Sequence, residues 1–190
     1  MTGGATVRES RLTKAGAHKR AQLLDAAEKL ITTSGVDVSL RSIATEAGVA
    51  IGHLQHYFPS RAELIHAVLE RALQRSLDRL AATVGGAPAP PEQVVSVVLA
   101  EHDDPLLVRL YVEVWASAAR DEAIASVVRE FYRSYTEHVA AYIRGCCPHL
   151  PESTLRAQAE AFVALMEGAS LIRSGIAGTQ SAATDAEITG

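Results

Sequence analysis

The chain has 190 residues, 48% of them hydrophobic, and a formal net charge of −4 at pH 7. This length allows one domain, or a small module and a larger one, and the composition excludes a disordered chain because a core can be buried. No apolar run approaches the roughly 20 residues of a membrane helix, and no apolar stretch follows the basic N-terminus as in a secretory signal. We therefore expect a cytoplasmic protein without a membrane partner, with reduced thiols at Cys146 and Cys147.

Charge is distributed unevenly along the chain. Residues 1–62 carry eight basic and five acidic side chains, whereas the remainder carries ten and seventeen. A basic N-terminal part followed by an acidic remainder is typical of a protein whose N-terminal part binds a polyanion. The remainder of such a protein has another function. A basic arm that is merely solvated would have the same composition, so charge alone leaves both interpretations open.

The front of the chain has the pattern of three helices. Apolar residues at a period of 3.6 predict the first helix, and they are Leu23, Leu24, Ala27, Leu30 and Ile31. Gly35 is expected to form its C-terminal cap. Ser39 is expected to cap a second, short helix, which Gly48 ends. A third helix is predicted from about residue 50 to residue 57, because Pro59 prevents its continuation.

The two short helices meet across the tight turn "EAGV". This pattern is typical of a helix-turn-helix motif, whose second helix lies in the major groove of DNA. A helix of two turns is not stable alone, so Leu54 and Phe58 should pack inward against the first helix. The opposite face of this third helix should then remain free, and its residues are Ile51, Gly52, His53, Gln55 and His56.

The remainder of the chain is also predicted to be helical. A long helix over about 61–82 precedes the Gly/Pro loop "TVGGAPAPP". Further helices are expected at about 92–102, 105–119, 122–144 and 152–174, followed by a tail with at most a short helix. No segment has the alternating pattern of a strand. We predict an all-α fold that begins with a three-helix helix-turn-helix module.

Residues 23–73 resemble the TetR family of one-component transcriptional regulators. The family's motif is present in fixed spacing at Gly35, Ser39, Ile43-Ala44, Ala47-Gly48-Val49, Gly52, His56-Tyr57-Phe58 and Pro59-Ser60-Arg61. His53 and Gln55 replace the threonine and tyrosine that are frequent in the family, so an operator sequence cannot be transferred through these positions. The stretches "IGHLQHYF" and "EAFVALMEGASLIRSG" resemble the choline-sensing repressor subgroup.

The resemblance implies a DNA-binding domain over 1–60 and a ligand-binding and dimerisation domain over 61–190. It implies a homodimeric repressor that binds a palindromic double-stranded DNA operator and is released by a small-molecule effector. The small residues of the 152–174 helix fit close approach of a second copy. An activator of the same architecture stays open, and so does a helical binding protein or enzyme that has lost DNA binding.

Residues of the helix-turn-helix motif can be given roles in DNA recognition. Gln55 can pair with adenine, His53 can donate to guanine N7, and Ile51 can contact a thymine methyl group. Gly52 allows close approach to the groove. The remaining candidates for phosphate or base contacts are Ser39, Arg41, His56, Tyr57, Arg61 and Lys19, with Lys14 and Arg20 adding positive charge. Each of these side chains, taken alone, could equally be solvated surface.

The body carries most of the aromatic residues and no enzyme motif. Small-molecule pockets are mostly apolar with a few polar anchors, and we expect Tyr111, Trp115 and Phe162 to line one. The expected polar anchors are His102, Arg109, Glu113 and His138. Simple core packing would explain the same aromatic residues, and Arg109 could form an i, i+4 ion pair with Glu113.

Metal binding and cofactors are not expected. His53 and His56 are three residues apart on a helix, but no histidine, cysteine or acidic cluster supplies the three or four ligands of a recognised site. The adjacent Cys146 and Cys147 are interpreted as structural, because only Arg144 is nearby in sequence to lower a thiol pKa.

Overall fold

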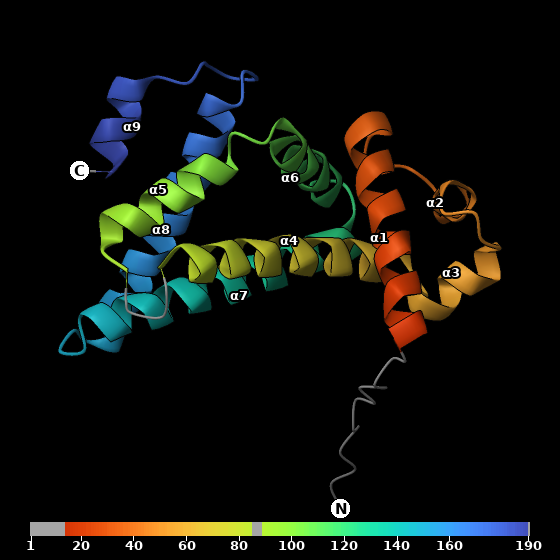
Figure 1. Cartoon of the computed structure of the whole chain (residues 1–190), viewed down its shortest axis with the longest axis horizontal. Helices are drawn as coiled ribbons and strands as arrows, with labels where there is room; N and C mark the ends of the chain where they lie inside the picture. Colours follow the sequence, from red (N-terminus) through yellow and green to blue (C-terminus); the bar gives the residue numbers. More distant parts are fainter. Residues whose placement is uncertain (1–13, 85–88, 190) are drawn as a thin grey trace, which may run out of the picture.

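The computed structural model describes residues 14–84 and 89–189, and these residues form nine helices and no strand (Figure 1). The helices are α1 (Lys14–Ser34), α2 (Leu40–Glu46), α3 (Ile51–Tyr57), α4 (Arg61–Val84), α5 (Pro91–Glu101), α6 (Pro105–Ala118), α7 (Glu122–Cys146), α8 (Glu152–Arg173) and α9 (Ala182–Thr189). The predicted all-α fold is confirmed. The tail contains one further helix, α9, beyond the well-defined helices predicted from periodicity.

Local sequence signals set the ends of the first three helices. Gly35 follows α1 with φ of +87°, a left-handed conformation that favours glycine. The Ser39 hydroxyl accepts a hydrogen bond from the Ser42 amide at 3.1 Å and so caps α2. Gly48, with φ of +65°, makes the turn between α2 and α3. These signals fold the front of the chain into the predicted helix-turn-helix arrangement.

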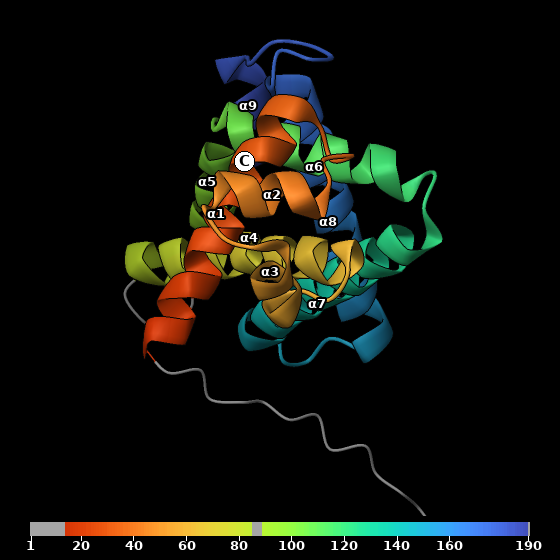
Figure 2. The ribbon, with the colours of Figure 1, turned by 90° about the vertical axis from the view of Figure 1, so that its right-hand side faces the viewer.

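The helices form an elongated molecule with α1, α2 and α3 at one end (Figure 1). The long helices α4 and α7 lie side by side along the molecule, α8 packs on α7, and α5 and α9 lie at the far end with α8. In Figure 2 the short helices α2 and α3 stand in front of α4 on the outer surface. The helix-turn-helix motif therefore caps one end of the bundle.

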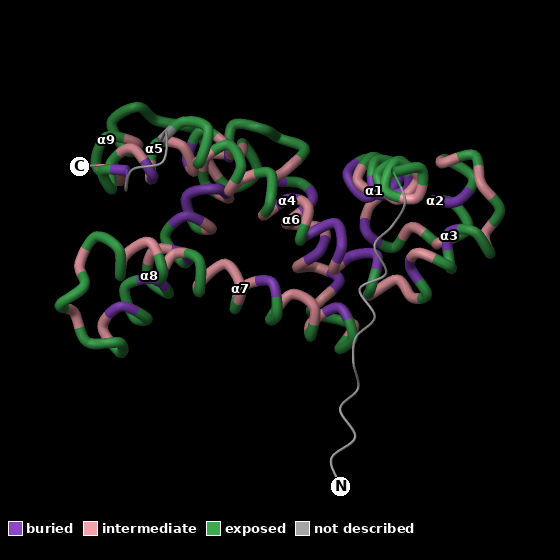
Figure 3. Tube along the Cα trace, turned by 60° about the horizontal axis from the view of Figure 1, so that its bottom comes forward, coloured by how far each residue is buried: buried purple, intermediate pink, exposed green. Residues whose placement is uncertain are grey.

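One buried cluster joins the front helices to the body. Leu24, Ile43 and Leu54 from the front pack in the same cluster as Leu69 of α4 and Val114 of α6. Figure 3 shows buried residues concentrated where α1, α4 and α6 meet. The predicted boundary at residue 60 therefore does not separate two hydrophobic cores. In the parts of the chain that the structure describes, no helix is long and apolar enough to cross a membrane.

Candidate nucleic-acid interface and ligand cavity

The outer face of α3 carries the side chains expected to meet DNA. Gly52, His53, Gln55 and His56 are exposed, whereas Leu54 on the opposite face is completely buried. The division follows from the helical period, which places residues one turn apart on the same side. A side chain at position 52 would have nothing within 4 Å of its Cβ, so Gly52 keeps this face open to a close approach.

Aromatic contacts hold the end of α3. The Tyr57 ring packs edge-on against His53 and His56, with ring centroids 5.5 Å and 5.4 Å apart. Phe58 is buried beneath it, and the Arg20 guanidinium lies over the Phe58 ring at 5.3 Å. Tyr57 is half-buried, so it restrains the two histidines while part of it remains accessible.

The other candidates for DNA contact surround this helix. Ser39 and Arg41 are exposed at the start of α2, and Ile51 is half-buried at the start of α3. Lys19 is half-buried on α1 and donates a hydrogen bond to the Gln22 side chain at 3.2 Å. Lys29 forms an ion pair with Glu46, which joins α1 to the end of α2.

Arg61, which was predicted to contact a phosphate, forms hydrogen bonds within the protein. One terminal nitrogen of its guanidinium, Nη2, donates to the Val36 carbonyl at 2.7 Å and to Asp37 Oδ1 at 2.9 Å. The same nitrogen lies 3.2 Å from the Ser117 hydroxyl of α6. These bonds follow from the start of α4 at Arg61, which directs this side chain back toward the loop between α1 and α2. A phosphate contact by Arg61 stays a prediction.

These contacts belong to a larger junction that we call the clasp. Its residues are Val36, Asp37, Arg61, Glu113, Ser117 and Arg120. The Val36 amide donates to Glu113 Oε2 at 3.3 Å, and Arg120 lies 3.7 Å from Asp37. The clasp thus connects the loop before α2 to both α4 and α6. Glu113 accepts this hydrogen bond from Val36, and it forms no ion pair with Arg109 among the described residues.

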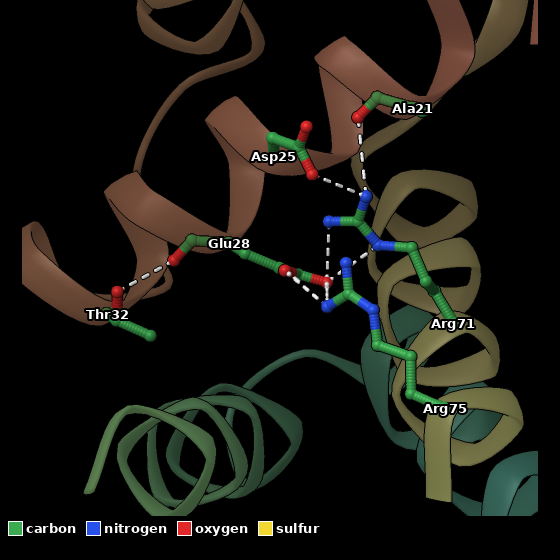
Figure 4. A network of polar contacts seen from close by, with 6 residues as sticks. All are labelled: Ala21, Asp25, Glu28, Thr32, Arg71 and Arg75. Atoms are coloured by element: carbon green, nitrogen blue, oxygen red, sulfur yellow. Dashed lines mark hydrogen bonds and ion pairs between the residues drawn. The ribbon is translucent and has the colours of Figure 1, made fainter. Parts of the chain in front are cut away.

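A second junction ties α1 to α4 (Figure 4). Arg71 of α4, only 16% exposed, lies 2.8 Å from Asp25 and 2.7 Å from Glu28, and Arg75 lies 3.1 Å from Glu28. Arg71 also donates to the Ala21 carbonyl at 3.3 Å. Because both acids lie on α1, these two arginines fix that helix to the middle of α4.

A cavity of about 340 Å³ lies within the body, bounded by α4, α5, α6, α7 and α8. Its wall is mostly aliphatic and aromatic. Four of the predicted ligand residues line it, and they are His102, Tyr111, His138 and Phe162. The structure therefore brings together residues that are up to sixty positions apart in the sequence. The volume of the cavity and the residues that line it suit a small, largely apolar organic molecule.

Besides Glu113 of the clasp, two predicted ligand residues lie outside this cavity. Arg109 is exposed on α6 and is not among the residues that line the cavity. Trp115 is half-buried and donates its indole N–H to the Tyr132 hydroxyl at 2.8 Å. The helical period fixes which residues share a face but does not fix how α6 is rotated against its neighbours. A ligand contact by either residue stays a prediction.

Glu167 of α8 and Tyr135 of α7, which were not among the expected ligand residues, also line the cavity. Burial raises the pKa of Glu167 to about 7, and a hydrogen bond from Tyr132 opposes this shift. Glu167 follows the buried Met166 in the apolar stretch "FVALMEGAS". A single acid in such a stretch was the signal that could have identified it.

The pKa values of the other polar groups indicate that they are neutral near pH 7. Burial and the nearby Arg173 lower the pKa of His102, which is 9% exposed. Burial raises the pKa values of Tyr111, Tyr132 and Tyr135. Within the described part of the chain, no three His, Cys, Asp or Glu side chains are grouped to hold a metal ion. Cys146 and Cys147 are free thiols at the cavity wall.

Two family models match separate parts of the chain. Residues 23–68 match the model described as "Bacterial regulatory proteins, tetR family", and residues 92–187 match "BetI-type transcriptional repressor, C-terminal". The transcriptional regulator UidR of Escherichia coli (strain K12) is 27% identical over 126 residues, which are 66% of this chain. The chain spans 64% of the length of UidR, slightly less than two thirds.

Solved structures show the same fold. A putative TetR-family regulator from Rhodococcus sp. has a TM-score of 0.75 at 22% identity, covering 92% of this chain and 96% of its own. A putative regulator from Saccharomonospora viridis in complex with choline has a TM-score of 0.64 at 19% identity, covering 90% and 94%. The two family models describe transcriptional regulators, which decides against the enzyme alternative. The predicted resemblance is confirmed, because the second model alone matches half of the chain: this protein belongs to the TetR family of bacterial transcriptional regulators.

Proposed function

We propose that the protein is a cytoplasmic, homodimeric repressor that binds a palindromic operator and releases it when a small molecule occupies the cavity. The observation that carries this proposal is the pair of junctions between the helix-turn-helix and the cavity wall. α4 lines the cavity through Leu73 and Leu77, and it holds α1 through Arg71 and Arg75. The description of the second family model favours a repressor over an activator.

The exposed face of α3 is the proposed reader of base sequence. Gln55 and His53 would contact base edges, Ile51 a thymine methyl group, and Gly52 would allow the backbone to approach. Ser39, Arg41, His56, Tyr57 and Lys19 would supply phosphate contacts around it. The proposal includes a DNA-binding part over residues 1–60 and a ligand-binding and dimerisation part over residues 61–190. It also includes a DNA contact for each residue named above.

Dimerisation is proposed through α8. Its exposed face is a stripe of small and apolar residues at helical spacing, namely Ala157, Ala161, Ala164, Leu165, Gly168 and Ile172. Leu165 is 50% exposed and Ile172 is 49% exposed, and small residues beside them allow a second helix to approach closely. A two-fold dimer would present two α3 helices one DNA turn apart, roughly 34–36 Å.

Selection from a random duplex pool tests the proposal. We expect the protein to enrich a palindrome with half-sites about one helical turn apart. Fluorescence anisotropy on that duplex should then show weaker binding as salt rises. An enriched sequence without two-fold symmetry, or no enrichment over random DNA, would contradict the proposed dimeric operator complex.

A further inference from the structure

Glu167 is an acidic side chain in the wall of a mostly apolar cavity. It lies beside the aromatic residues Tyr111, Tyr135 and Phe162, which line the same space. Acidic side chains are seldom placed in such surroundings without a partner, because burial penalises the charged form. The contacts of Glu167 therefore indicate what the cavity is built to hold.

Tyr132, a neighbour of both Trp115 and Glu167, influences the charge of the Glu167 carboxyl group. Trp115 donates its indole N–H to the Tyr132 oxygen at 2.8 Å. An indole can only donate, so the single hydrogen of Tyr132 remains for another acceptor. The Glu167 carboxyl group is the neighbouring acceptor, since interaction with Tyr132 lowers its pKa. Tyr132, which Trp115 orients, therefore supports the ionised form of Glu167.

The protein does not neutralise this acid. Across residues 14–84 and 89–189, no lysine, arginine or histidine forms an ion pair with Glu167. The other acid in the cavity wall, Glu101 of α5, differs because Arg79 of α4 lies 2.9 Å from it and the Ser76 hydroxyl also donates to it. One of the two acids is thus paired within the chain, and the other is available to a ligand.

The remaining groups around the cavity tolerate a cation near Glu167. Tyr111 on α6 and Tyr132 and Tyr135 on α7 are neutral, since burial raises their pKa values. His102 at the end of α5 is neutral because its pKa is lowered. His138 on α7 also lines the cavity. Aromatic ring faces attract a cation within about 6 Å, and more strongly where water is excluded.

His102 provides a second sign of a ligand. Its ring is 9% exposed, it lines the cavity, and its Nδ1 atom has no hydrogen-bond partner within the described chain. A buried polar atom without a partner destabilises a protein unless a ligand or water completes it. Its environment disfavours a positive charge on this ring, so it would not repel a cationic ligand.

We propose that this cavity binds a hydrophobic amine, whose protonated nitrogen pairs with Glu167 and whose apolar body fills the space between α4, α5 and α7. This inference rests on the proposed function only in naming the amine as the effector. A carboxylate ligand is disfavoured by the unpaired acid. A small hydroxylated cation is disfavoured because it would leave most of the apolar wall uncovered.

Isothermal titration calorimetry with ligands of one chain length tests the charge requirement. At pH 8 we expect n-octylamine to bind at least tenfold more tightly than n-octanol, and n-octanoate to bind more weakly than either. n-Octylamine should bind about fifteenfold more tightly than n-hexylamine, because each buried methylene contributes about fourfold. Choline should bind at least tenfold more weakly than n-octylamine.

Substitution of the acid identifies the pairing group. Glu167→Gln keeps the size of the side chain, and it should reduce n-octylamine binding to the level of n-octanol while leaving n-octanol unchanged. Glu160→Gln is the matched control, because Glu160 is exposed on the same helix. Retained n-octanol binding shows that the variant is folded. Unchanged n-octylamine binding by Glu167→Gln, or tighter binding of n-octanoate than of n-octylamine, would overturn the proposal.

The pH dependence gives an independent readout. The amine stays protonated from pH 6 to pH 8, whereas the ionised fraction of Glu167 rises from about one tenth to about nine tenths if its pKa is about 7. Binding of n-octylamine should therefore strengthen up to about tenfold, and binding of n-octanol should stay constant. A flat profile for the amine in the unaltered protein would contradict the pairing.

A measurement of operator affinity in the presence of the amine distinguishes failure of this inference from failure of the proposed function. If n-octylamine binds through Glu167 but the affinity for the selected operator stays unchanged, the proposed effector release fails and the amine site stands. If another compound releases the operator and n-octylamine does not bind, the amine site fails and the repressor proposal stands.

Discussion

Replacing Arg61 with alanine removes the guanidinium that joins three segments in the clasp. The bonds to the Val36 carbonyl and the Ser117 hydroxyl are part-buried. Hydrogen bonds from a charged donor contribute about 1.5–3 kcal/mol each before relaxation. Asp37 is 75% exposed, so its ion pair adds little. We expect a loss of about 2 kcal/mol, which corresponds to a decrease in Tm of about 4–8 °C for a chain of this size.

The assay that distinguishes the clasp from a phosphate contact is the salt dependence of operator binding. Each lost phosphate contact lowers the slope of log affinity against log salt by about 0.9, or about 1.8 for a two-fold complex. Arg61→Ala should leave this slope unchanged when binding is measured well below the Tm. Arg41→Ala, in an exposed side chain at the start of α2, should lower it. The variant Arg120→Ala is the stability control, because Arg120 lies 3.7 Å from Asp37 and is 64% exposed.

Two results would refute this reasoning. If Arg61→Ala lowers the salt slope as much as Arg41→Ala does, Arg61 contacts phosphate in the complex and releases the clasp to do so. If Arg61→Ala and Arg120→Ala change the Tm equally little, the clasp contributes no stability at Arg61.

Three further predictions concern the face of α3, the face of α8 and the cavity. Gln55→Ala should weaken binding to the selected operator by about 1–3 kcal/mol and leave binding to random DNA unchanged; an equal loss on both would exclude base reading. Gly168→Glu should convert a dimer into a 20.2 kDa monomer in sedimentation, without strain in the fold because nothing lies within 4 Å of the added Cβ. Gly145→Glu, equally unhindered on α7, is its control. Glu167 should make the free energy of unfolding fall as pH rises from about 5 to 7, since a carboxyl whose pKa is raised in the folded state binds its proton more tightly there. Glu167→Gln should flatten this fall, and equal slopes in both proteins would contradict the raised pKa.

Helical periodicity was sufficient to predict most of the fold. Leu54 and Phe58 are buried as expected, and the opposite face of α3 is exposed, because a residue's side of a helix follows from its position in the turn. Gly35 and Gly48 adopt the positive φ that their places at helix ends indicated. These features depend on neighbours within a few residues, so the sequence contains the necessary information.

Features that depend on the packing of distant helices were not predictable in the same way. Arg61 turns toward Ser117, fifty-six residues later in the chain. The tail helix α9 is held because Arg173 lies 2.8 Å from Asp185 and donates to the Leu99 carbonyl at 2.6 Å. Pattern analysis does not reveal such pairs, since either partner would be equally acceptable on a solvated surface.

The position of α4 explains how a ligand in the cavity could affect the DNA-binding end of the molecule. Leu73 and Leu77 face the cavity, while Arg71 and Arg75, which lie two residues before them, hold Asp25 and Glu28 of α1. A ligand that displaces this part of α4 must also displace the anchor of α1, because the two sets of side chains alternate within about two turns of one helix. The clasp adds a second connection through α6, whose Tyr111 also faces the cavity. Since operator grooves are fixed in spacing, a small movement of α1 and α3 can cost the 1–3 kcal/mol that is typical of coupling between sites.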